Sequence, residues 1–119
     1  MKKAELPLPP ERCRNRLLNH YGAGVSDWFA SVPERLAETA HKWQLAPTEY
    51  HDAGHASVLL LADTSSGERV LLKAWPDSER CVREISALRL WADVPAARVL
   101  KVDGERSIAA LTLVGGQPG

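Results

Sequence analysis

The fold follows from residues 57–92, which read SVLLLADTSSGERVLLKAWPDSERCVREISALRLWA. The first half holds two apolar runs rich in Val and Leu, at 57–62 and 69–75. Turn residues at 63–67 separate them, which predicts an antiparallel hairpin because so short a connection leaves no room for a crossover. The second half has apolar residues at helical spacing and predicts a helix that ends at about Ala92.

Similar patterns lie on both sides of this stretch. Further segments read as helices at 11–21 and 31–43, and as strands at 48–53, 98–103 and 107–114. The sequence therefore predicts an α+β fold: a five-stranded antiparallel sheet with one helix inserted between strands three and four, preceded by one or two N-terminal helices. Residues 1 to about 10 are rich in proline and predict a loose arm.

Two helix starts carry capping signals. Ser31, with Glu34 three residues later, matches a capping box, and Pro33 would then lie in the first turn, where proline is tolerated. Asp77 or Ser78 can cap the helix that follows the hairpin.

Length, charge and cysteine content narrow the class of protein. The 119 residues and 13.1 kDa fit a single domain, and 15 basic residues balance 15 acidic ones. No apolar run approaches the ~18 residues that cross a bilayer. Cys13 and Cys81 lie far apart without a secretory context, which indicates free thiols in a reducing compartment. We expect a cytoplasmic protein that binds neither nucleic acid nor membrane.

One carboxylate lies where a helix should be apolar. Cys81 and Ile85 mark the stripe of the 78–92 helix that faces the sheet, and Glu84 falls beside it. Lys73 lies on the preceding strand among apolar neighbours. A Lys73–Glu84 ion pair would compensate both buried charges. In the alternative, Lys73 extends to the sheet edge and Glu84 lies at the rim of its stripe.

The turn between the first two strands is made of small residues. Backbone N–H groups at Gly54, His55 and Ala56, with the Ser57 hydroxyl, could bind phosphate oxygens there, although hairpins also use Gly simply to turn. The spacing of His51 and His55 suits a metal site only on a helix, and their strand context predicts none.

Five stretches, taken in order, resemble a known family. They are WFASVP (28–33), GHASV (54–58), LK (72–73), EISALRLW (84–91), and ARVL (97–100) followed by Asp103. Together they resemble the amino-terminal lobe of the protein-kinase-like fold, and more closely the bacterial aminoglycoside phosphotransferases, in their streptomycin and hydroxyurea kinase branch. The similarity covers about residues 25–114.

This resemblance implies an ATP-binding lobe of an antibiotic-resistance kinase. Lys73 would bind the α- and β-phosphates and be held by Glu84, while Gly54, His55, Ala56 and Ser57 would form the loop over the phosphates. Leu71 would cover the base, and residues 112–116 would form the hinge. Mg²⁺ is expected only in a complete two-lobed enzyme. The implied domains are an arm and short helix at 1–24, the lobe at 25–114, and a truncated hinge or tail at 115–119.

The sequence also departs from the family pattern. Leu71 stands where kinases usually have a small alanine, and the 119 residues contain no His-x-Asp with a downstream asparagine and no Asp-Phe-Gly. We therefore expect no kinase turnover from this chain alone, with a separate carboxy-terminal lobe or a homo-oligomer as possible partners. Two alternatives stay open: a binding or regulatory module that does not use ATP, and an obligate oligomer. In the oligomer, a second copy would cover a patch for which Leu71, Trp75, Leu88 and Trp91 are candidates.

Overall fold

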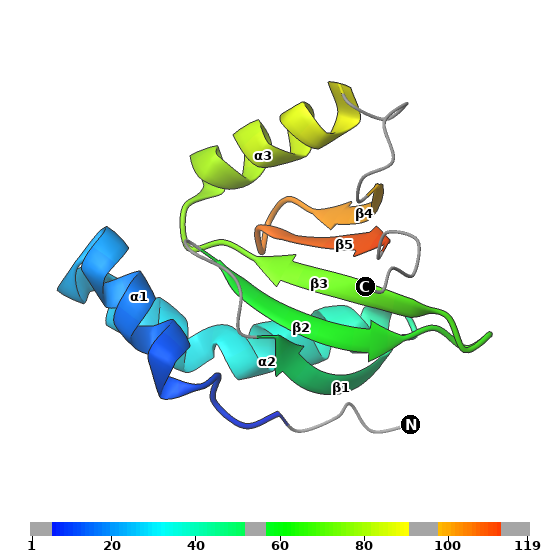
Figure 1. Cartoon of the computed structure of the whole chain (residues 1–119), viewed down its shortest axis with the longest axis horizontal. Helices are drawn as coiled ribbons and strands as arrows, with labels where there is room; N and C mark the ends of the chain where they lie inside the picture. The colour runs from blue at the N-terminus through cyan, green and yellow to red at the C-terminus, as the bar shows by residue number, and fades with distance from the viewer. Residues whose placement is uncertain (1–5, 52–56, 91–97, 113–119) are drawn as a thin grey trace.

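The computed structural model describes residues 6–51, 57–90 and 98–112, without the side chains of 88–90. The elements, in order, are α1 (Glu11–Tyr21), the 3₁₀ turn η1 (Ala23–Val25), α2 (Ser26–Lys42), β1 (Ala46–His51), β2 (Val58–Asp63), β3 (Arg69–Ala74), α3 (Ser78–Leu90), β4 (Val99–Asp103) and β5 (Ile108–Thr112). The strands form one antiparallel sheet in the order β1-β2-β3-β5-β4 (Figure 1). This confirms the predicted fold class.

The sheet separates two apolar clusters, because successive side chains of a strand point to opposite faces. Leu72 and Ala74 of β3 face the larger cluster, which α1 and α2 cover, whereas Leu71 faces the smaller cluster under α3. Figure 1 shows α3 on one side of the sheet and α1 with α2 on the other. Lys73 lies between Leu72 and Ala74 in sequence and is therefore on the α3 side.

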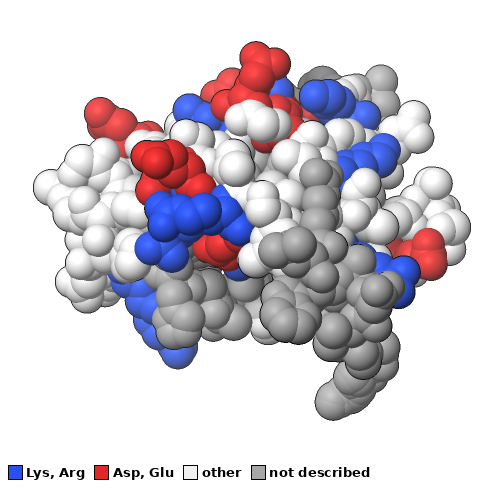
Figure 2. All heavy atoms as spheres, turned by 90° about the horizontal axis from the view of Figure 1, so that it is seen from above, with Lys and Arg blue, Asp and Glu red and all other residues white. Residues whose placement is uncertain are grey.

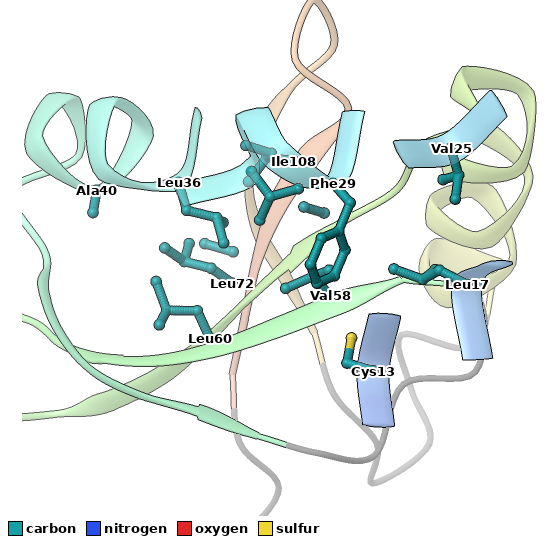
Figure 3. Close-up of a cluster of buried hydrophobic side chains, with 13 residues drawn as sticks. Cys13, Leu17, Val25, Phe29, Leu36, Ala40, Val58, Leu60, Leu72 and Ile108 are labelled. Carbon is teal, nitrogen blue, oxygen red and sulfur yellow. The ribbon is translucent and has the colours of Figure 1, made fainter. Parts of the chain in front are cut away.

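The larger cluster fixes the position of β3. Figure 3 shows Phe29 and Leu36 of α2 packed toward Leu60 and Leu72 of the sheet, and Leu17 of α1 belongs to the same cluster. The predicted boundary between the arm with its short helix (1–24) and the lobe (25–114) stays a prediction. β3 is hydrogen-bonded to a strand on each side, and its side chains on this face are buried. Its backbone is therefore held in place, which fixes where side chains on its other face begin.

The predicted start of the second helix was wrong. α2 begins at Ser26, so Ser31 and Pro33 lie inside the helix. The Ser31 hydroxyl donates to the Trp28 carbonyl at 2.7 Å and accepts from Arg35 Nε at 2.8 Å, and so it caps nothing. Burial of Phe29 and Val32 stabilises the additional turns, which offsets the backbone hydrogen bond that proline cannot donate.

The amino-terminal segment and β1 also differ from the prediction. Pro9 is buried, and the Tyr50 hydroxyl donates to the Pro7 carbonyl at 2.6 Å, so residues 6–10 lie against the domain rather than forming a loose arm. β1 starts at Ala46 and includes Pro47, which an edge strand tolerates because half of its N–H groups face away from the sheet. The predicted strand ends at 52–53 and 113–114, and the helix end at Ala92, lie outside the described residues.

An ion network joins the β4–β5 turn to α2. Asp103, 5% exposed, accepts from the Arg106 backbone N–H at 3.2 Å and from its Nη1 at 2.9 Å, and lies 3.5 Å from Lys42 Nζ. Arg106 Nη2 also donates to Glu38 Oε1 at 3.3 Å. Burial raises the pKa of Asp103, but the hydrogen bonds from Arg106 outweigh it and leave the pKa lowered. Asp103 is therefore held in its ionised form, and its bonds to Arg106 and Lys42 tie the turn to α2.

We expect Leu72→Ala to lower the free energy of unfolding by about 2–5 kcal/mol, because the fully buried side chain leaves a cavity under the central strand. Val82→Ala, at a 63% exposed position, should change it by less than about 0.5 kcal/mol. Urea denaturation followed by circular dichroism measures both. Equal losses in the two variants would contradict the described core.

Candidate functional site

The candidate site lies where β3 passes into α3. Asp77 provides the connection: its Oδ1 accepts from the Glu79 N–H at 3.0 Å and its carbonyl accepts from the Cys81 N–H at 3.0 Å. Of the two predicted caps, Asp77 is thus the one used. The short connection lays α3 across the face of the sheet that carries Lys73 and brings Glu84, two turns into the helix, over the strand.

The predicted Lys73–Glu84 ion pair is present. Lys73 Nζ donates to Glu84 Oε1 at 2.9 Å, and Trp75 Nε1 donates to Glu84 Oε2 at 2.9 Å. Both carboxylate oxygens of Glu84 are therefore hydrogen-bonded, one to Lys73 of β3 and the other to Trp75, which directly follows that strand. The side chains of Lys73 and Glu84 are 24% and 33% exposed, so the pair lies at the border of the core. Its ammonium is within reach of a ligand.

The electrostatics of the site favour an ionised Glu84. Burial raises the pKa of Glu84, but the hydrogen bonds from Lys73 and Trp75 outweigh it and leave the pKa below its usual value. Arg80, one turn earlier on α3, adds a positive charge 4.0 Å from Oε2. The Lys73 ammonium also lies 5.2 Å from the centre of the Trp75 ring.

Apolar residues flank Lys73 in the sheet. Cross-strand pairing places Lys73 between Leu59 of β2 and Ala109 of β5. Leu71, one pleat away on the same face, lies in a row with Leu61 and Leu111 and is partly exposed. The result is a partly exposed ammonium beside two partly exposed leucines, Leu61 and Leu71, a combination that suits a ligand with both an anionic and a flat apolar part.

Of the remaining predicted site residues, only Ser57 and Thr112 fall within the part of the chain that the structure describes. Ser57 precedes β2 and is 2% exposed, which leaves its hydroxyl little access to solvent. Gly54, His55 and Ala56 lie outside the described residues, as do positions 113–116 of the predicted hinge. Thr112 ends β5, where its hydroxyl accepts from the Arg98 N–H at 2.9 Å.

Two members of the site were missed from sequence. Trp75 shares a sheet face with Lys73 at the spacing of two residues, a signal that was available. Arg80 was not assigned to the site, but its Nη2 donates to His20 Nε2 of α1 at 3.0 Å and its Nη1 lies 4.0 Å from Glu84 Oε2. The spacing of Arg80 and Glu84, four residues on one helix, was the signal for that contact.

Three further expectations concern the cysteines, the apolar patch and a metal site. Cys13 and Cys81 form no disulfide, as predicted, and both are buried. Trp75 is fully buried and thus belongs to the core, while Leu71 stays partly exposed; the side chains of Leu88 and Trp91 are not described. Within residues 6–51, 57–90 and 98–112, no three His, Cys, Asp or Glu side chains gather to hold a metal ion.

Charges on the α3 side of the molecule are mixed. Figure 2, which views this side, shows acidic and basic residues beside one another among the described atoms. None of the helices in the described part of the chain is both long and apolar enough to span a bilayer.

Comparison with known proteins found a distant similarity to a kinase. No protein-family model matches the chain. Streptomycin 6-kinase of Streptomyces glaucescens is 26% identical over 111 residues, which cover 93% of this chain. The chain spans only 36% of the length of that relative. This distant similarity fits part of an aminoglycoside kinase-like protein and supports the coarser part of the predicted resemblance.

We expect Glu84→Gln to lower the free energy of unfolding by about 1 kcal/mol at pH 7, a value kept small because the pair is partly exposed to solvent. The folded-state pKa of Glu84 is depressed, so its contribution is present above the unfolded-state pKa and is lost as pH falls through the folded-state value. Thermal unfolding between pH 7 and 3 should therefore show the wild type and the variant converging below about pH 4.5. A constant difference across that range would contradict the depressed pKa.

Proposed function

We propose that this chain binds ATP through Lys73 and forms the nucleotide-binding part of an aminoglycoside kinase-like enzyme. One observation carries the proposal: the Lys73 ammonium, 2.9 Å from Glu84 Oε1 and partly exposed, lies on a rigid strand next to an apolar surface. An ammonium held by a carboxylate at the edge of the core is a suitable donor to phosphate oxygens.

The surroundings fit the parts of a nucleotide. The Lys73 ammonium would donate to oxygens of the α- and β-phosphates, with Glu84 keeping it charged and oriented. Leu71 and Leu61, both partly exposed and about 7 Å along the sheet from Lys73, would lie against the base. The proposed roles of Gly54, His55, Ala56 and Ser57 at the phosphates rest on the family resemblance.

Phosphoryl transfer needs groups that the site does not provide. A base for the acceptor hydroxyl and carboxylates for Mg²⁺ are required, and the described residues offer no such cluster near Lys73. We infer that this chain alone binds the nucleotide without turning it over. A second lobe would supply those groups, and transfer to a hydroxyl of an aminoglycoside such as streptomycin is the reaction that the name of the relative suggests. Such an activity would confer antibiotic resistance, and its need for ATP fits a cytoplasmic protein.

Thermal unfolding with ATP and MgCl₂ tests the binding. ATP at 100 times its Kd should stabilise the wild type by about 2.7 kcal/mol. Lys73→Met should abolish this gain because it removes the ammonium while keeping the aliphatic part of the side chain. Lys101→Met is the matched control, since Lys101 is exposed on the edge strand β4, and it should respond as the wild type does.

Three results would contradict the proposal. The first is a wild type whose unfolding temperature ATP does not change. The second is a Lys73→Met variant that keeps the full gain, and the third is a Lys101→Met variant that loses as much of the gain as Lys73→Met. The first would favour a module that keeps the fold without using ATP.

Incubation with streptomycin and ATP tests the absence of turnover. We expect the wild-type chain to release no more ADP than the Lys73→Met variant, because the described residues place no cluster of base and metal-binding carboxylates near Lys73. Chromatography of ADP measures this. Streptomycin-dependent ADP release that Lys73→Met abolishes would show that the chain is catalytically complete.

A further inference from the structure

The Trp75 side chain contacts both members of the ion pair. Its Nε1 donates to Glu84 Oε2 at 2.9 Å, and its ring lies 5.2 Å from Lys73 Nζ. Glu84 therefore bridges two residues on the same face of the sheet, each bonded to a different carboxylate oxygen. Neither the family resemblance nor the candidate nucleotide site requires this second bond.

Trp75 is the better fixed of the two donors. It is fully buried in the smaller cluster with Cys81 and Ile85 of α3, and its backbone N–H donates to the Ser107 carbonyl at 3.0 Å. An indole packed on all sides has little freedom to rotate. Its N–H therefore points to one place, which the Glu84 carboxylate occupies.

Lys73 differs in each of these respects. Its side chain is 24% exposed and ends in an ammonium on a flexible four-carbon stem, which can reorient at small cost. Cation–π attraction to the Trp75 ring would keep the ammonium close to the strand during such a movement. The two bonds to Glu84 are thus a rigid one from Trp75 and an adjustable one from Lys73.

We propose that Trp75 is a positioning residue that fixes Glu84 over β3, so that Lys73 can turn toward a phosphate group while α3 stays in place. The phosphate part of this inference rests on the proposed function; the positioning of Glu84 by Trp75 does not. Without this second donor, a Glu84 carboxylate that lost Lys73 would be a partly buried charge, and among the described residues Arg80, at 4.0 Å, would be left to compensate it. Because the indole N–H still donates to Glu84, α3 can stay in place when the Lys73 ammonium turns to the nucleotide.

The indole N–H resonance of Trp75 reports directly on this bond. The chain has four tryptophans, and ¹⁵N–¹H spectra resolve the indole group of each. In the wild type, one indole resonance should titrate with the Glu84 carboxyl, with a midpoint below 4.5 because that pKa is depressed. Glu84→Gln should abolish the titration, whereas Glu79→Gln, an exposed carboxylate on the same helix, should leave it unchanged.

The decisive variant is Lys73→Met. If Trp75 fixes Glu84, the same indole resonance still titrates in this variant, with a higher midpoint because the ammonium is gone. An indole that no longer titrates in Lys73→Met would overturn the proposal, since Lys73 would then be what holds the carboxylate. A wild type in which no indole follows Glu84 would overturn it as well. None of these results depends on whether ATP binds.

A second variant measures the consequence for the nucleotide. Trp75→Phe keeps an aromatic ring in the core and removes the N–H, and we expect its Kd for ATP to rise about three- to tenfold. Suppose that Trp75→Phe leaves the Kd for ATP unchanged while the wild type shows the indole titration described above. Glu84 would then not need Trp75 to orient Lys73, which would overturn the proposal that Trp75 supports phosphate binding. A wild type that binds no ATP would contradict the proposed function, while the indole titration would still decide the role of Trp75.

Discussion

The whole site depends on keeping the Glu84 carboxylate charged at the border of an apolar cluster. A carboxylate there is costly unless donors satisfy both of its oxygens. Lys73 satisfies one oxygen and Trp75 the other, and both come from the same strand end, so the carboxylate also ties α3 to β3. A single side chain thereby sets the charge of the site and the position of the helix above it.

The rest of the fold makes this bond possible. β3 is the central strand of the sheet, and α1 and α2 bury its far face, which leaves Lys73 on a rigid support. α3 has a smaller apolar contact, through Cys81 and Ile85, and only three residues separate its start from the end of β3. The large core thus holds the strand, whereas the small cluster and the carboxylate hold the helix. The smaller cluster leaves the α3 side of the sheet less buried, and the polar Lys73–Glu84 pair lies on that side.

Local patterns predicted much of this and missed what distant contacts decide. The hairpin, the helix and the facing of Lys73 and Glu84 follow from periodicity in residues 57–92, because spacing alone places a side chain on a face. The start of α2 was missed because burial of Phe29 and Val32 extends the helix past the local signal at Ser31. Spacing places Trp75 on the face of Lys73 but does not give the side-chain rotamer that bonds it to Glu84. The bond from Arg106 to Glu38 joins residues 68 positions apart, so spacing does not reveal it.

The chain is distantly similar to a streptomycin kinase and spans 36% of its length, and the proposal that Lys73 binds phosphate rests on this similarity together with the ion pair. The most direct measurement follows the Lys73 side chain by NMR, with ¹³C-labelled lysine, during titration with ATP and, separately, with adenosine. A Lys73 ammonium that binds phosphate predicts a saturable shift of its ¹³Cε resonance with ATP and little change with adenosine. A Lys73 resonance that ATP leaves unchanged, while the Glu84 bond persists, would show that the ion pair is purely structural.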